Sequence, residues 1–146
     1  MPGIIVGIDG SAHSARALEW AIKQGALQHA AVTVITVNSV PASPWSGGNP
    51  LILAQDPAVL EKMHQAAEEM ALKVTSQLGQ ARPASVTVRA VNGFPSKELI
   101  DASRDADLLV VGSRGAGGFA RLMVGSTSDQ VVHHAHCPVV VVRSEG

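Results

Sequence analysis

Three apolar runs in this sequence are continuous rather than alternating: Ile4–Val6, Leu108–Val111 and Val139–Val142. A strand with one face in water alternates apolar and polar residues, so a continuous run indicates a strand that is covered on both faces. Such strands are typical of parallel sheets with helices packed on either side. The runs therefore predict a parallel α/β fold, and the 146 residues fit a single domain over 1–146.

Helical patterns separate the β-rich runs. One begins after Ser11, a residue type favoured at helix N-caps, and extends to about His29; a second extends from about Pro57 to Leu78. The positions whose three- and four-residue spacing predicts an apolar face are Ala15, Leu18, Ile22 and Ala26 in the first helix and Val59, Met63, Ala67, Met70 and Val74 in the second. The first three strands are expected at 4–9, 32–37 and 86–91. A third strand–helix pair and a last strand follow them.

Composition narrows the class of function. The 11 basic and 12 acidic residues nearly cancel, which argues against a nucleic-acid or anionic-membrane surface. The single cysteine, Cys137, has no partner for an internal disulfide, and the N-terminal residues do not resemble a secretion signal. The apolar runs are too short to span a bilayer. We therefore expect a soluble, cytoplasmic protein that binds small ligands or protein partners.

A glycine spacing follows the run at 108–111. Gly112 comes directly after it, and Gly115 follows after two more residues. After nine further residues, Gly125 and Ser126 precede a helical pattern. A phosphate chain needs exposed backbone N–H groups, a tight turn and a helix N-terminus that points toward it. This segment combines all three and predicts a phosphate-binding loop.

The end of the first strand is expected beside this glycine loop. In doubly wound sheets, ligands bind beyond the carboxyl ends of the strands where the strand order reverses, here the first and fourth strands. The first strand ends at Asp9, which is followed by the turn residues Gly10 and Ser11. Within that strand, Gly7 indicates either close approach of a ligand or packing against a helix. We expect one pocket between the two strand ends.

The connection 41–50 is long for this fold and contains Trp45. It is interpreted either as a lid over the ligand, as a solvated loop, or as a segment whose tryptophan packs on a partner chain.

Other chemistries are less well supported. The segment 115–120 matches a dinucleotide fingerprint, but too little chain follows it for the strand–helix–strand unit that the motif needs. No Gly-Lys-Ser/Thr follows the glycines, so the lysine that supports phosphoryl transfer is missing. His133, His134 and His136 lack matching ligands elsewhere in the sequence, so we predict no metal site there. A hydrolase triad would need a nucleophile elbow that the sequence lacks.

Taken in order, several motifs resemble those of the universal stress protein family, in particular its ATP-binding branch. They are Val6-Gly7-Ile8-Asp9-Gly10-Ser11, Gly93-x-Pro95, the glycine spacing from Gly112 to Ser126, and Cys137-Pro138 followed by four valines. The similarity covers essentially the whole chain. It implies a five-stranded sheet of order 3-2-1-4-5 that resembles the adenine-nucleotide α-hydrolases.

The resemblance also implies residue roles on the nucleoside side of the site. Asp9 matches a carboxylate that hydrogen-bonds ribose hydroxyls or helps to hold Mg²⁺; the alternative is a cap for the following helix. Val37 matches the position whose backbone contacts the adenine edge; the alternative is a core residue at a strand end. Gly7 lies beside them.

On the phosphate side, Gly112 and Gly115 would lie against the ribose and α-phosphate. Gly125, Ser126 and Thr127 would donate hydrogen bonds to the β- and γ-phosphates at the start of the last helix. Arg114 and Arg121 either neutralise phosphate charge or are solvated.

The resulting hypothesis is a cytoplasmic ATP-binding regulator of the stress response, with or without Mg²⁺ and with at most slow hydrolysis. The alternatives are AMP or cyclic AMP in the same pocket, a protein-interaction module without nucleotide, and an enzyme that uses Asp9 with Arg114 or Arg121. The strand Val139–Val142 would be an exposed edge in a monomer, so we expect it to pair with its copy in a homodimer, as the resemblance also implies.

Overall fold

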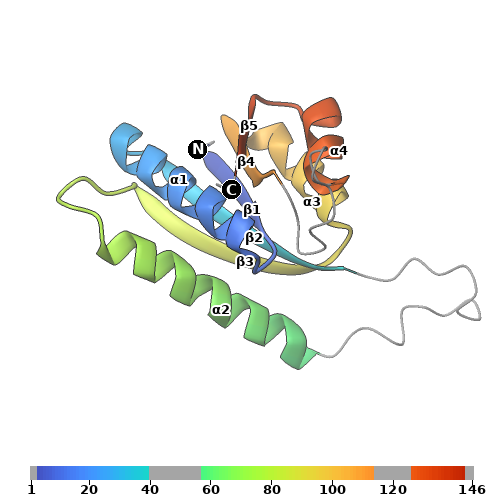
Figure 1. Ribbon diagram of the computed structural model, residues 1–146, viewed down its shortest axis with the longest axis horizontal. Coiled ribbons are helices and arrows are strands. Elements are labelled where there is room, and N and C mark those ends of the chain that lie inside the picture. Colours follow the sequence, from blue (N-terminus) through green and yellow to red (C-terminus); the bar gives the residue numbers. More distant parts are fainter. Residues whose placement is uncertain (1–2, 40–56, 114–125, 144–146) are drawn as a thin grey trace, which may run out of the picture.

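The computed structural model describes residues 3–39, 57–113 and 126–143. Strand and helix alternate along these ranges, as the sequence predicted (Figure 1). The strands are β1 (Ile4–Ile8), β2 (Ala31–Ser39), β3 (Ser85–Gly93), β4 (Leu108–Gly112) and β5 (Val139–Val142). The helices are α1 (Ala12–Gln28), α2 (Pro57–Ser76), α3 (Pro95–Ala102), the short 3₁₀ helix η2 (Ser103–Asp105) and α4 (Ser126–His134).

The strands form one five-stranded sheet of order β3-β2-β1-β4-β5 in which neighbouring strands are parallel. At its centre, Val6 of β1 lies opposite Val34 of β2 and Val110 of β4, and all three side chains are fully buried. Burial of both faces explains why these strands are continuously apolar. The predicted fold class and strand order are confirmed.

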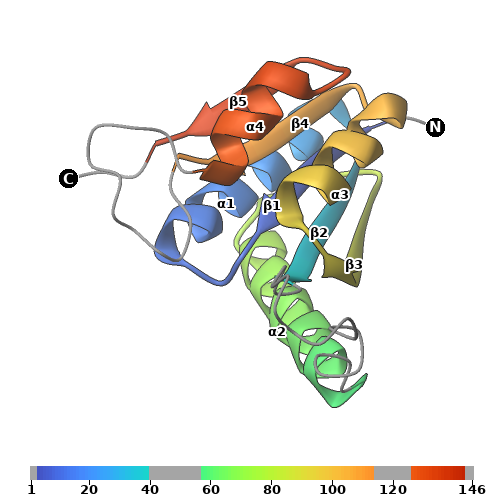
Figure 2. The same ribbon diagram turned by 90° about the vertical axis from the view of Figure 1, so that its right-hand side faces the viewer.

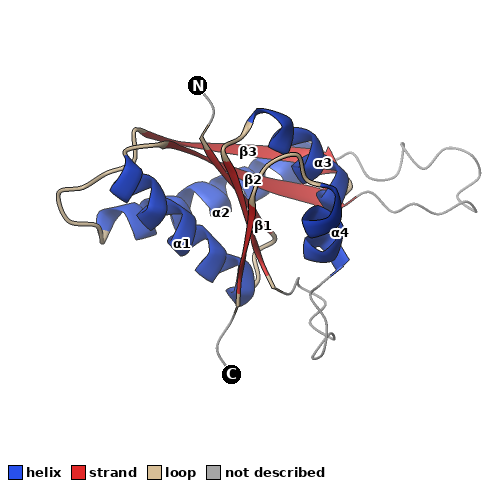
Figure 3. Cartoon of the chain, turned by 90° about the horizontal axis from the view of Figure 1, so that it is seen from above, coloured by secondary structure: helices blue, strands red, loops and turns tan. Residues whose placement is uncertain are grey.

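Helices cover both faces of the sheet (Figure 3). α1 and α2 pack on one face, where Leu18 and Ile22 join the buried side chains of β1 and β2. α3 and α4 pack on the other, where Leu99 and Val131 join those of β2 and β4. The apolar cores are therefore two layers separated by the sheet.

The start of α1 is fixed by a side-chain cap. Ser11 has an extended backbone, and its Oγ accepts a hydrogen bond from the N–H of Ser14 at 3.2 Å. This bond satisfies one of the N–H groups that the first turn of a helix leaves without a partner. The predicted N-cap is confirmed.

β2 and β3 are longer than the apolar runs predicted. β2 continues past Val37 to Ser39, and β3 continues to Gly93, with Asn38 opposite Asn92. The Asn38 Nδ2 donates a hydrogen bond to the Asn92 Oδ1 at 2.9 Å, so a polar pair continues the ladder. Apolar patterning ends where the two side chains become polar, although the backbone pairing does not.

The expected inward-facing stripe of α2 is wrong at its first position. Val59 is 39% exposed, whereas Ala67 and Ala71 are buried. Figure 2 shows the reason: the first part of α2, coloured green, extends away from the sheet. Periodicity identified the helix but not where along its length it contacts the sheet.

Candidate functional site

The topology predicts a ligand crevice at the carboxyl ends of β1 and β4. These strands are neighbours in the sheet, and the chain passes from β1 into α1 on one face. After β4, the next described element is α4, on the opposite face. The reversal of connection between adjacent strands opens the space in which ligands of such folds bind.

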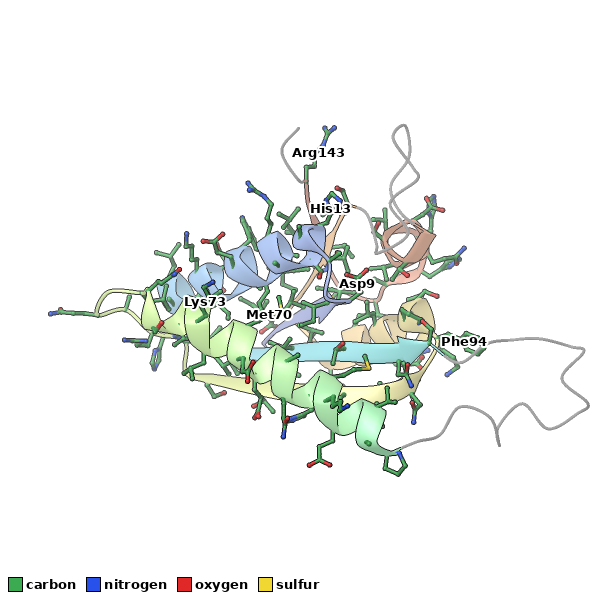
Figure 4. All side chains as sticks on the ribbon, turned by 60° about the horizontal axis from the view of Figure 1, so that its bottom comes forward. Asp9, His13, Met70, Lys73, Phe94 and Arg143 are labelled. Atoms are coloured by element: carbon green, nitrogen blue, oxygen red, sulfur yellow. The ribbon has the colours of Figure 1, made fainter. Side chains whose placement is uncertain are left out.

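Asp9 lies directly after β1, at the strand end where the crevice is predicted. Its side chain is exposed, and its Oδ1 accepts a hydrogen bond from the Ser11 N–H at 2.9 Å. Its own N–H donates to the Oγ of the buried Ser14 at 3.2 Å. These bonds fix the turn, and Ser11 rather than Asp9 is the helix cap. The carboxylate is thus held in place at the strand end where a ligand could contact it (Figure 4).

Gly10 makes the turn after Asp9 possible. Its φ is +85°, a left-handed backbone conformation that residues other than glycine adopt only with strain. An added Cβ would meet no atom within 4 Å. The requirement for glycine therefore comes from the backbone and not from crowding.

Val37 lies on β2, which is on the opposite side of β1 from β4. The ladder between β1 and β2 ends at Ile8 opposite Thr36, so β2 extends three residues beyond its neighbour, Val37 to Ser39. Val37 is partly buried among the side chains on the α3 and α4 face. It is therefore not the last residue of its strand, and the backbone that follows it lies along the edge of the predicted pocket.

Two predicted site glycines have structural reasons of their own. A Cβ on Gly7 would lie 2.6 Å from the Cδ1 of Leu99, so α3 packs directly on this position. A Cβ on Gly112 would lie 2.9 Å from the carbonyl oxygen of His13. Both glycines are explained by close packing, and their roles toward a ligand stay predictions.

We expect Gly112→Ala to lower the free energy of unfolding by about 1–3 kcal/mol, because the new methyl group would press on the backbone of the first turn of α1. Gly79→Ala is the matched control, since a Cβ there meets nothing within 4 Å. Urea denaturation of both variants measures the difference. Equal stability of the two would show that the contact between β4 and α1 is looser than described. A substitution at Gly112 is therefore a poor test of ligand binding.

The phosphate side of the site is described in part. α4 is described from Ser126 to His134, and Thr127 near the start of this range is partly buried. The first N–H groups of a helix and its dipole favour an anion at this end. Arg114, Gly115, Arg121 and Gly125 lie outside the described residues, as does the loop with Trp45.

One residue near the site could not be identified from the sequence. His13, in the first turn of α1, approaches Gly112 through its backbone. Among the described residues, its Nδ1 is a buried side-chain atom without a hydrogen-bond partner. Only the packing of α1 against β4 brings it to this edge, so no sequence motif indicates it.

The histidines and Cys137 lie at the C-terminal end of α4: His133 and His134 are in its last turn, and His136 and Cys137 follow it. His133 is exposed, and its Nδ1 lies 2.8 Å from the carbonyl oxygen of Asp129, one turn earlier in α4. Cys137 is partly exposed; desolvation, and to a smaller extent the nearby Asp107, raises the pKa of its thiol. Within the described ranges, no three His, Cys, Asp or Glu side chains come together as a metal site.

Comparison with known proteins decides the family. The sequence profile of the universal stress protein family matches residues 2–143. The chain belongs to this family. It is 34% identical to a universal stress protein of Mycolicibacterium smegmatis over 143 residues, which cover 98% of this chain and 48% of the relative. The chain thus spans about half the length of the curated relatives it matches.

Solved structures of universal stress proteins share the fold. UspA from Lactobacillus plantarum superposes with a TM-score of 0.76 at 23% identity and covers 97% of each chain. A universal stress protein in complex with cAMP superposes with a TM-score of 0.69 at 25% identity, over 99% of this chain and 98% of that one.

None of the helices described here is both long and apolar enough to cross a membrane.

Proposed function

We propose that this universal stress protein binds an adenine nucleotide, ATP in the first instance, in the crevice between β1 and β4. The observation that carries the proposal is the placement of Asp9 and of the start of α4 beyond the ends of two adjacent strands. A carboxylate suits ribose hydroxyls, and a helix N-terminus suits phosphate. The two therefore match the two ends of a nucleotide.

The proposed contacts follow the same division. On the nucleoside side, Asp9 hydrogen-bonds the ribose, the backbone at Val37 contacts the adenine edge, and Gly7 lies beside them in β1. On the phosphate side, Gly112 and Gly115 lie against the ribose and α-phosphate, and the start of α4 donates to the distal phosphates. The phosphate-side residues of the proposal are Gly112, Arg114, Gly115, Arg121, Gly125, Ser126 and Thr127.

A second candidate ligand is AMP or cyclic AMP. The observation that favours it is the similar fold of the universal stress protein solved in complex with cAMP. The nucleoside contacts would serve either ligand, and only the contacts to the distal phosphates distinguish ATP. The choice therefore depends on the start of α4 and on the segment before it.

We further propose that nucleotide occupancy acts as a regulatory signal in the stress response of the cytoplasm, with at most slow hydrolysis because no phosphate-binding lysine follows the glycines. The edge strand β5, whose four valines are all partly exposed, would pair with its copy in a homodimer. Pairing would remove an exposed apolar edge, which is an aggregation hazard.

Calorimetric titration of nucleotide-free protein with Mg-ATP, AMP and cyclic AMP tests the ligand. The proposal predicts that ATP binds more tightly than AMP, because only ATP places a γ-phosphate at the start of α4. Tighter binding of cyclic AMP or AMP would establish the second candidate. If none of the three nucleotides bound, the proposed function would fail and a protein-interaction role would replace it.

A further inference from the structure

A second pocket lies between α1 and α2 on the outer face of the molecule, with a volume of about 280 Å³. Four residues of each helix line it: Ala15, Arg16, Leu18 and Glu19 from α1, and Met70, Lys73, Val74 and Gln77 from α2. Figure 4 shows Met70 and Lys73 on the side of α2 that faces α1. The lining lies on helix faces, whereas the crevice described above lies at the strand ends.

The floor of this α1–α2 pocket is apolar. Leu18 is fully buried, and Met70 and Val74 are partly buried against the core beneath the two helices. Covering the exposed parts of Met70 and Val74 removes apolar surface from water and so favours binding. Ligand sites of proteins are typically about 300–1,000 Å³ in volume, so this pocket, just below that range, suits only a small ligand.

The rim is positively charged. Arg16 and Lys73 are exposed, one on each helix, and their side chains form no ion pair or hydrogen bond with any described residue. Glu19 lies at the same rim and forms an ion pair of 3.1 Å between the Lys23 Nζ and its own Oε2. Arg16 and Lys73 thus flank an apolar floor, and the one acidic residue of the lining is paired with Lys23 instead of with either of them.

We infer that the α1–α2 pocket binds a small amphipathic carboxylate, a medium-chain fatty acid being the simplest example. Its alkyl chain covers Met70 and Val74, while its carboxylate lies between the guanidinium of Arg16 and the ammonium of Lys73. A neutral alcohol would leave both cations without a partner, and an alkylammonium would be repelled by them. Charge complementarity therefore selects the anion, and the volume selects a short chain.

This inference is independent of the proposed nucleotide site. The carboxylate would contact none of the residues assigned to the nucleotide, so binding of one ligand is expected without the other. Failure of nucleotide binding would leave this pocket unaffected, and the reverse holds as well.

The test is an NMR titration of the ¹⁵N-labelled protein with decanoate below its micelle-forming concentration. We expect amide shifts concentrated in Ala15–Glu19 and Met70–Gln77. The double variant Arg16→Glu/Lys73→Glu should bind decanoate about tenfold or more weakly, which corresponds to about 1.4 kcal/mol. Lys62→Glu, an exposed lysine of the same helix outside the pocket, is the matched control and should bind like the wild type.

Three results with soluble ligands would overturn the inference. They are undiminished decanoate binding by the double variant, equal binding of decyltrimethylammonium, and shifts that map to other elements or do not occur at all. Binding to phospholipid vesicles without binding of free decanoate would also overturn it, in favour of a membrane surface. Lys73→Gln, which removes one charge without reversing it, should give an intermediate affinity and serves if the double variant is unstable.

Discussion

Leu18→Ala is expected to lower the free energy of unfolding by about 3 kcal/mol, within the range of about 2–5 kcal/mol for truncation of buried leucines. Leu18 is fully buried between α1 and the sheet, in the same cluster as Val6, Val34 and Val110. Its truncation would leave a cavity that the close-packed strands cannot fill by relaxing. Urea denaturation followed by circular dichroism measures the loss.

The same substitution elsewhere in α1 provides the control. Leu27 is 79% exposed near the end of the helix, so Leu27→Ala should change the free energy of unfolding by less than about 0.5 kcal/mol. Both variants replace leucine by the better helix former, so propensity cancels in the comparison. Similar losses for the two would mean that α1 contacts the sheet through a different face.

Asp9→Asn is expected to weaken ATP binding by at least about tenfold, because hydrogen bonds to a charged group contribute about 1.5–3 kcal/mol. The replacement retains a side-chain oxygen that can accept the Ser11 N–H, now at 2.9 Å from Asp9 Oδ1, so the turn before α1 should persist. What the variant loses is the negative charge offered to the ribose. Calorimetric titration of both proteins with Mg-ATP gives the ratio of dissociation constants.

A neutralised carboxylate away from the crevice separates this effect from a general change in charge. Asp105, an exposed residue of η2, is suitable, and Asp105→Asn should bind ATP as the wild type does. Unchanged affinity in Asp9→Asn, with thermal stability preserved, would remove Asp9 from the site. An equal loss in both variants would point to long-range electrostatics instead.

Much of the fold could be predicted because strands that are buried on both faces are continuously apolar in sequence. The runs at 4–6 and 108–111 are apolar on both faces, and helices cover both faces of the sheet there, whereas the valines of 139–142 at the sheet edge are only partly buried. The boundaries of β2 and the contact of Val59 could not be predicted. The first depends on a polar pair, Asn38 with Asn92, that forms only after the strands align, and the second on the direction in which α2 leaves the sheet.

The candidate site was predicted in the same uneven way. Asp9 and the start of α4 follow from the position of turn and cap residues relative to strands. Gly7 and Gly112 satisfy a motif, but the same glycines relieve crowding against Leu99 and His13, and a sequence cannot separate the two causes. The α1–α2 pocket depends on how two helices are placed side by side, which no local pattern records.

The claim that an adenine nucleotide binds beyond β1 and β4 is tested most directly by mapping amide shifts of the ¹⁵N-labelled protein at saturating Mg-ATP. The account predicts the largest shifts at 9–14, at 37–39 and in the first turn of α4. Shifts confined to the opposite end of the sheet, around Ala30 and Ser85, or no shifts at saturating ATP, would contradict it.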